Sequence, residues 1–118
     1  MAIHTHLPIY KVAYDLFDVS VDLVVNMPRA FKAAIGSRVS QLCLDMVKQI
    51  YRANVARDKV PHIEVLQEQK EELDLLLRLC VDKRLITRKQ YARVVELTSS
   101  VGKQAIGWKR HHATSPAT

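Results

Sequence analysis

The chain has 118 residues, 48% of them apolar and 25% charged, a composition typical of one globular domain with a real core rather than a disordered or fibrous chain. Three glycines and four prolines are too few for a turn-rich β protein, and no run approaches the ~20 apolar residues of a membrane span. The formal net charge of +6 favours acidic partners, and it alternates along the chain: −2 over 1–27, +5 over 28–57, −4 over 58–82 and +7 over 83–118.

Hydrophobic periodicity predicts an all-α protein whose four helices form an up-down-up-down bundle with short connections. Pro8 and Pro61 suit the first turns of the first and third helices, and a break at Gly36 should precede the second. Thr87 and Gln90 have the spacing of a capping box at the start of the fourth helix. The helices are expected at about residues 8–26, 37–57, 59–82 and 87–110, within one domain over 1–118 that ends in a disordered tail over 111–118.

The first two predicted helices carry more apolar surface than a four-helix monomer can bury. In the second helix, Ile50 and Ala53 belong to the core stripe, while Tyr51 and Val55 belong to a neighbouring stripe. A helix packed on one side needs an apolar arc of only about 100°, and contiguous exposed patches usually mark interfaces. The pattern therefore predicts a homo-oligomer. The side chains expected to be structural are Leu42, Met46, Ile50, Leu73, Leu77, Val94 and Trp108.

The sequence also predicts structural roles for two polar residues near the end of the second predicted helix. Asn54 falls between the two apolar stripes, where a half-buried amide needs hydrogen-bond partners. Arg57 points back towards the core side at the helix end, so we expect it to cap the last carbonyl groups rather than to bind a ligand.

Catalytic and metal-binding chemistry has little support in the sequence. Cys43 and Cys80 lie inside apolar patterns without CxxC spacing, which indicates reduced core thiols. No Glu-x-x-His pair of the kind that holds di-iron sites in bundles occurs. We therefore expect no enzyme, no cofactor and no metal site. The five histidines lie near the chain ends or in an opening helix turn: His4, His6, His62, His111 and His112.

The basic residues are the remaining functional signal. Pairing with the acidic first and third helices could neutralise some of them, and Arg78 has Asp74 and Asp82 four residues on either side. Pairing cannot consume all of the excess, which could bind phosphates through counterion release. The aromatic residues mostly lie on apolar stripes, so no base-stacking platform is indicated. The candidate residues for nucleic-acid or partner contact are Arg38, Lys48, Arg52, Arg78, Lys83, Arg84, Arg93 and Lys103.

Several short strings occur in order along the chain, with Gly36 between the second and the third: LPIYK at 7–11, PRAFK at 28–32, IYRAN at 50–54, LLLRL at 75–79, KQYARV at 89–94 and GKQAIGW at 102–108. Over about residues 7–108 the chain resembles the accessory variability determinant (Avd) proteins of diversity-generating retroelements. More distantly, it is similar to the four-helix proteins encoded in ribosomal RNA intervening sequences. Met27 stands where an aromatic residue is usual in the family, and Lys103 stands where arginine is common, which keeps the charge but loses bidentate geometry.

The resemblance implies a non-catalytic partner of a reverse transcriptase that forms a pentameric ring with a basic surface for RNA, DNA and the polymerase. Such a protein supports mutagenic reverse transcription of the element's template RNA. An alternative is an oligomeric protein-interaction scaffold of the intervening-sequence type, whose charge serves solubility and a protein partner. The opening segment has no apolar signal region, so a cytoplasmic location is expected in either case.

Overall fold

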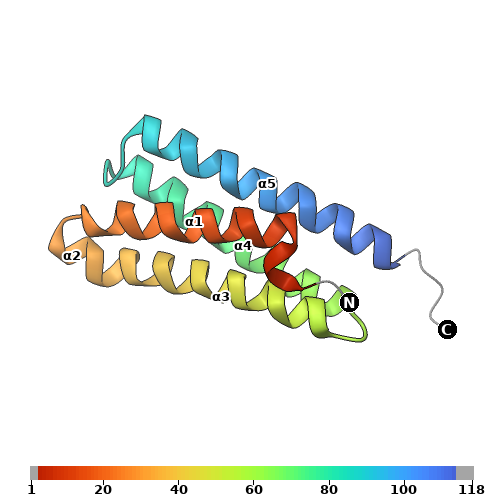
Figure 1. The fold of residues 1–118 in the computed structure, drawn as a ribbon. Helices are drawn as coiled ribbons and strands as arrows, with labels where there is room; N and C mark the ends of the chain where they lie inside the picture. The colour runs from red at the N-terminus through yellow and green to blue at the C-terminus, as the bar shows by residue number, and fades with distance from the viewer. Residues whose placement is uncertain (1–2, 114–118) are drawn as a thin grey trace.

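Four long helices lie side by side, and short helical elements and turns join them at the two ends of the molecule (Figure 1). The computed structural model describes residues 3–113, and within that range it contains helices and no strand. None of these described helices combines the length and the apolar character that crossing a membrane requires. The elements in chain order are the 3₁₀ helix η1 (His4–His6), α1 (Pro8–Val25), α2 (Arg29–Phe31), the π-helix η2 (Lys32–Gly36), α3 (Ser37–Val55), α4 (Val60–Asp82) and α5 (Arg88–Ala113).

Each long helix packs against two others, which places one hydrophobic core in the middle. Both α1 and α4 pack against α3 and against α5. The α1–α3 and α4–α5 connections lie at one end of the molecule, and the α3–α4 connection lies at the other (Figure 1). Trp108 is only half-buried and packs against the edge of the core. The other six side chains expected to be structural are 0–1% exposed: Leu42, Met46, Ile50, Leu73, Leu77 and Val94.

The last helix runs further than the sequence predicts. It ends at Ala113 rather than near residue 110, so residues 111–113 are helical instead of belonging to a disordered tail. The rest of the expected tail, 114–118, lies outside the described residues.

Gly36 does not interrupt the helical backbone that leads into α3. Its φ of −60° and ψ of −42° are helical, and η2 continues directly into α3. A side chain at this position would place Cβ 2.6 Å from Cγ1 of Val24, at the end of α1. The glycine is therefore explained by the close approach of η2 and α1, a tertiary contact that interpreting Gly as a helix breaker misses.

A lysine, and not the expected arginine, caps the end of α3. The Lys59 ammonium donates to the carbonyl oxygens of Asn54 at 2.6 Å, Ala56 at 2.9 Å and Ala53 at 3.3 Å. Helix ends leave carbonyl groups without partners inside the helix, and a cation there also matches the negative end of the helix dipole. Because α3 ends at Val55, Arg57 lies in the exposed connection instead of on the last turn.

The second apolar stripe of α3 lies on the surface of the molecule. Tyr51 is 48% exposed and Val55 is 46% exposed, and Tyr14 of α1 is 54% exposed. The His4 ring packs edge-on against Tyr10 and Tyr51, with ring centroids 5.2 Å and 4.8 Å apart, and so joins η1 to both helices. Apolar and aromatic side chains of α1 and α3 therefore remain exposed on the surface of the molecule. Asn54, expected to be half-buried, is 6% exposed.

Candidate nucleic-acid interface

The five-residue turn between α4 and α5, residues 83–87, has a capping motif at each of its ends. At the end of α4 the Leu85 amide donates to the Cys80 carbonyl at 2.8 Å, and the Arg84 amide donates to the Val81 carbonyl at 3.1 Å. This is a Schellman motif, whose central residue normally is glycine because it adopts positive φ. Arg84 occupies that position with φ 59°, a conformation that costs an ordinary residue about 1–2 kcal/mol.

The start of α5 confirms the capping box predicted from the sequence. The Thr87 amide donates to Oε1 of Gln90 at 2.8 Å, and the Gln90 amide donates to the Thr87 hydroxyl at 3.0 Å. The two motifs together give the turn a defined backbone, which sets the direction in which Arg84 and Arg88 leave it.

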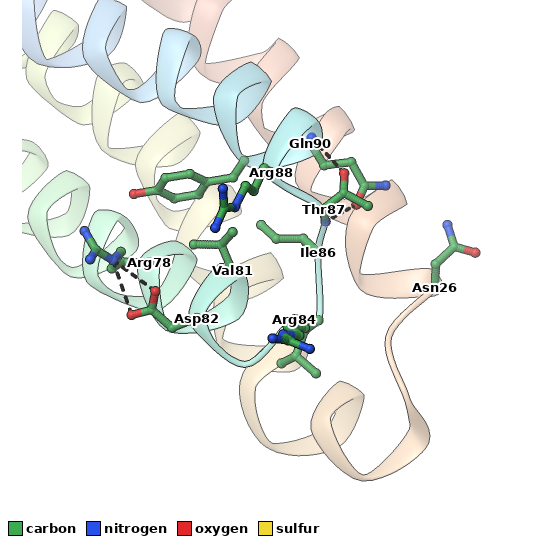
Figure 2. A pocket seen from close by; sticks show the side chains of 11 residues that line it. Asn26, Arg78, Val81, Asp82, Arg84, Ile86, Thr87, Arg88 and Gln90 are labelled. Carbon is green, nitrogen blue, oxygen red and sulfur yellow. Dashed lines mark hydrogen bonds and ion pairs between the residues drawn. The ribbon is translucent and has the colours of Figure 1, made fainter.

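A depression of about 990 Å³ lies beside this turn (Figure 2). Arg78 reaches it from α4, Arg84 from the turn and Arg88 from the first turn of α5. The remaining lining is mostly apolar or neutral, with Tyr91 half-buried on α5. The other lining residues are Asn26, Val81, Asp82, Leu85, Ile86, Thr87 and Gln90.

Arg78 makes one of the two ion pairs that its spacing allows. Its Nε lies 3.2 Å from both carboxylate oxygens of Asp82. The other candidate, Asp74, lies 2.7 Å from the Lys70 ammonium instead. Burial alone lowers the pKa of Lys70, but Asp74 and Glu71 outweigh it and raise that pKa overall. Arg78 thus keeps an exposed guanidinium that a neighbouring carboxylate orients.

The predicted basic residues of α3 do not line this depression. Arg38 pairs with Glu72 of α4, with its Nε 2.6 Å from the carboxylate. Arg52 has a long 3.4 Å contact with Oε1 of Gln49, and Lys48 is exposed with no ion pair among the described residues. Lys48 and Arg52 therefore keep charge that the acidic helices do not neutralise.

The predicted basic residues at and after the turn are spread from the end of α4 along α5. Lys83 lies over the Phe31 ring, with its ammonium 5.9 Å from the ring centroid. Arg93 lies 3.7 Å from Glu96, at the outer limit of an ion pair, and Lys103 is exposed. Because α3 and α5 each pack on α1 and α4, their basic residues project from different parts of the bundle.

The structure thus divides the predicted residues instead of gathering them into one site. It brings Arg78 and Arg84 together at the depression, and it adds Arg88 and Tyr91, which the candidate set did not contain. Arg88 could have been predicted from its position directly after the capping Thr87, because a side chain there lies at the N-terminal end of the helix. Tyr91 carries no such signal, because its spacing suits a core position equally well.

Comparison with known proteins supplies the family. A family model described as bAvd-like matches residues 7–112. The chain belongs to the bAvd-like family. This assignment agrees with the resemblance carried by the ordered strings, and it suggests an Avd-type accessory protein rather than an enzyme. A search of curated proteins finds no match.

The titratable groups of this bAvd-like protein are arranged for structure more than for chemistry. Burial raises the pKa of the Cys43 thiol to about 11, against a smaller opposing effect of Ser20, and burial also raises the pKa of Cys80. A protonated, buried thiol is a poor nucleophile. Burial, then His111 and Lys59, lower the pKa of His112. No cluster of three or more metal-ligating side chains forms among the described residues.

Proposed function

We propose that this bAvd-like protein is a non-catalytic accessory protein of a diversity-generating retroelement. It binds the element's reverse transcriptase and its template RNA or cDNA, and it thereby supports mutagenic reverse transcription. The observation that carries the proposal is the family match over residues 7–112. The proposal includes a cytoplasmic location, because a reverse transcriptase works where its RNA template is.

The charge distribution supports nucleic-acid binding. Lys48, Arg52 and Lys103 are exposed basic residues without an ion pair among the described residues, and the stretch 83–118 carries a formal charge of +7. Such charges release counterions from a phosphate backbone and give affinity with little base readout. Binding should therefore weaken steeply with salt, with log K falling by about 0.9 for each phosphate neutralised on duplex DNA.

The exposed apolar stripe supports a homo-oligomer, and the family resemblance implies a pentameric ring of up-down-up-down bundles. Connections at alternate ends of the molecule support that bundle order. Val55 lies on the exposed stripe, so Val55→Lys should dissociate the assembly in analytical ultracentrifugation while circular dichroism stays helical. Ser37→Lys, an equally charged change at an exposed position on the same helix, should leave the assembly intact.

The decisive experiment is co-purification of the protein with the neighbouring reverse transcriptase, with and without nuclease treatment. Charge reversal at Arg52 and Arg93 should weaken nucleic-acid retention, while reversal at Lys11, an exposed lysine of α1, serves as the matched control. Affinity for nucleic acid that stays flat between low and moderate salt would contradict the proposal.

A protein-interaction scaffold without a nucleic-acid role is the second candidate. It is favoured by ion pairs that neutralise part of the basic surface, such as Arg38 with Glu72 and Lys109 with Glu64 at 3.0 Å. Co-purification of an acidic protein partner, combined with a preparation free of nucleic acid, would select this candidate.

A further inference from the structure

The depression beside the α4–α5 turn combines two surfaces of different chemistry. Arginine side chains reach it from three directions, from α4, from the turn and from α5 (Figure 2). Between them the lining is apolar and aromatic, with buried Ile86, half-buried Leu85 and half-buried Tyr91. A basic surface that bound a phosphate backbone through charge alone would not require this depression.

The size and lining of the depression limit what fits it. At about 990 Å³ it lies within the range of small-molecule sites, and it is far larger than one phosphate ion. A phosphate alone would leave the apolar floor uncovered, and a purely apolar molecule would leave the arginines without partners. A planar aromatic ring that carries a phosphate satisfies both surfaces, and a nucleotide has this composition.

The backbone of Arg84 gives an independent reason to look for a ligand here. The central position of a Schellman motif is one where glycine is favoured, and Arg84 holds it at φ 59°. Strained residues of this kind cluster at binding sites, and this strain places a guanidinium at the rim of the depression.

Within the described part of the chain, Asp82 is the one acidic residue in the lining, and its position indicates how a ligand with a phosphate at one end would be oriented. Asp82 lies with Arg78, whose Nε is 3.2 Å from both of its oxygens, so this side of the depression is close to neutral. Arg84 and Arg88 have no ion pair among the described residues, so they are the lining cations that no carboxylate neutralises. A phosphate therefore belongs near Arg84 and Arg88, with the base towards Tyr91 and Ile86.

We propose that this depression binds one unpaired nucleotide of a nucleic-acid strand, with the base against Tyr91 and the phosphate facing Arg84 and Arg88. The inference rests on the proposed nucleic-acid binding and deepens it. Bases in a duplex are stacked inside the helix, whereas unpaired bases can be splayed out and stacked on aromatic side chains. The site therefore selects strand ends, bulges and loops over continuous duplex.

The test compares two blunt-ended fluorescent duplexes of equal length and charge, each made as RNA and as DNA. In one, a central nucleotide lies opposite an abasic position and is unpaired; in the other, the complementary base is present and the duplex is continuous. Wild-type protein should bind the probe with the unpaired nucleotide at least about fivefold more tightly, the low end of what one base stacked on an aromatic side chain contributes. With 5-bromouracil at the unpaired position, irradiation should crosslink the probe to the peptide that contains Tyr91.

Three variants separate the site from general electrostatics. Arg84→Gly removes the guanidinium while keeping the turn, and it should bring the affinity ratio of the two probes close to one. Tyr91→Leu should do the same, whereas Tyr91→Phe, which keeps the ring, should retain the preference. Lys89→Gln is the matched control, because this exposed neighbour of Arg88 does not line the depression, and it should weaken both probes equally.

The outcomes are distinct. Equal affinity of wild-type protein for the two probes, or a ratio unchanged in both Arg84→Gly and Tyr91→Leu, overturns the unpaired-nucleotide site and leaves general nucleic-acid binding standing. Failure of every probe to bind at low salt overturns the proposed nucleic-acid binding itself. A preference seen with RNA alone or DNA alone supports the site and identifies the sugar that it accepts.

Discussion

Replacing Lys59 with methionine tests whether one ammonium group holds the end of α3. Methionine keeps most of the side-chain length and apolar volume but removes all three hydrogen-bond donors. Two of the contacts, to the Asn54 and Ala56 carbonyls, are 2.6 Å and 2.9 Å long, while the third, to Ala53, is weaker at 3.3 Å. A hydrogen bond to a charged group contributes about 1.5–3 kcal/mol, and the helix-dipole interaction adds about 0.3–1 kcal/mol.

Water replaces part of this network when the lysine is removed, because the site is only partly buried. We therefore expect Lys59→Met to lower the free energy of unfolding by about 2–3 kcal/mol, less than the sum of the separate contacts. With an unfolding entropy of roughly 2 cal/mol/K for each residue, the midpoint temperature should fall by about 8–12 °C. Urea unfolding followed by circular dichroism at 222 nm measures the change, at one protein concentration for all variants.

Two controls on the same helix region decide the interpretation. Lys48→Met removes the same charge from an exposed position without an ion pair, and Arg57→Met tests the residue that the sequence favoured as the cap. Each should change the free energy of unfolding by less than about 0.5 kcal/mol. If Lys59→Met is as mild as these controls, or Arg57→Met is as severe as Lys59→Met, the capping argument is wrong.

Four further predictions follow from single positions in the structure. Ser20→Ala should raise the free energy of unfolding by about 1 kcal/mol, because the buried Ser20 hydroxyl has no hydrogen-bond partner among the described residues other than a weak contact with the Cys43 thiol, whose pKa it lowers slightly. Urea unfolding measures the change, and a loss of stability would show that the hydroxyl is satisfied. Gly36→Ala should destabilise by about 1–2 kcal/mol, since the new Cβ would lie 2.6 Å from Cγ1 of Val24, and a Val24→Ala background should remove most of this effect in a double-mutant cycle. Arg84→Gly should stabilise the protein by about 1 kcal/mol in thermal melts by relieving positive φ, and unchanged stability would argue against strain at the turn. The raised pKa of Cys43, about 11 against an ordinary 9.0, means that the unfolded thiol ionises first, so its contribution to the free energy of unfolding should be constant below pH 9 and fall by about 2–3 kcal/mol towards pH 11. Cys43→Ala should remove this part of the fall and leave the contribution of Cys80, whose pKa burial also raises.

The helices were predictable because their determinants are local. Apolar spacing placed six of the seven side chains expected to be structural in the core, and the Thr87–Gln90 capping box forms with both of its hydrogen bonds. These features depend on residues within one or two helical turns of each other, so a single sequence contains them. Trp108 illustrates the limit, because helical spacing gives the face of the helix but not how deeply a large ring at the edge of that face is covered.

The candidate site was less predictable because it depends on groups from several elements. Charge counting found the excess of lysine and arginine, but it could not tell that Glu72 partly neutralises Arg38 while Lys48 stays unpaired. Arg88 and Tyr91 join Arg78 only because the α4–α5 turn folds one helix back along the other. The spacing of residues along the sequence does not show which side chains of different helices lie close together.

The sequence by itself determined the helical class, the core stripes, the capping box and the short motifs shared with the family, since each of these depends only on residue types and short spacings. The tertiary structure alone decided the rest. Gly36 lies where α1 and η2 approach closely, Lys59 and not Arg57 caps α3, and Arg84 adopts a positive φ that normally favours glycine. For Gly36 the physical reason is that its contact with Val24 joins two elements that only packing brings together. The Lys59 cap and the Arg84 turn join residues at most six apart, but they depend on where each helix ends and how the chain turns towards the next helix, which the residue types alone do not specify.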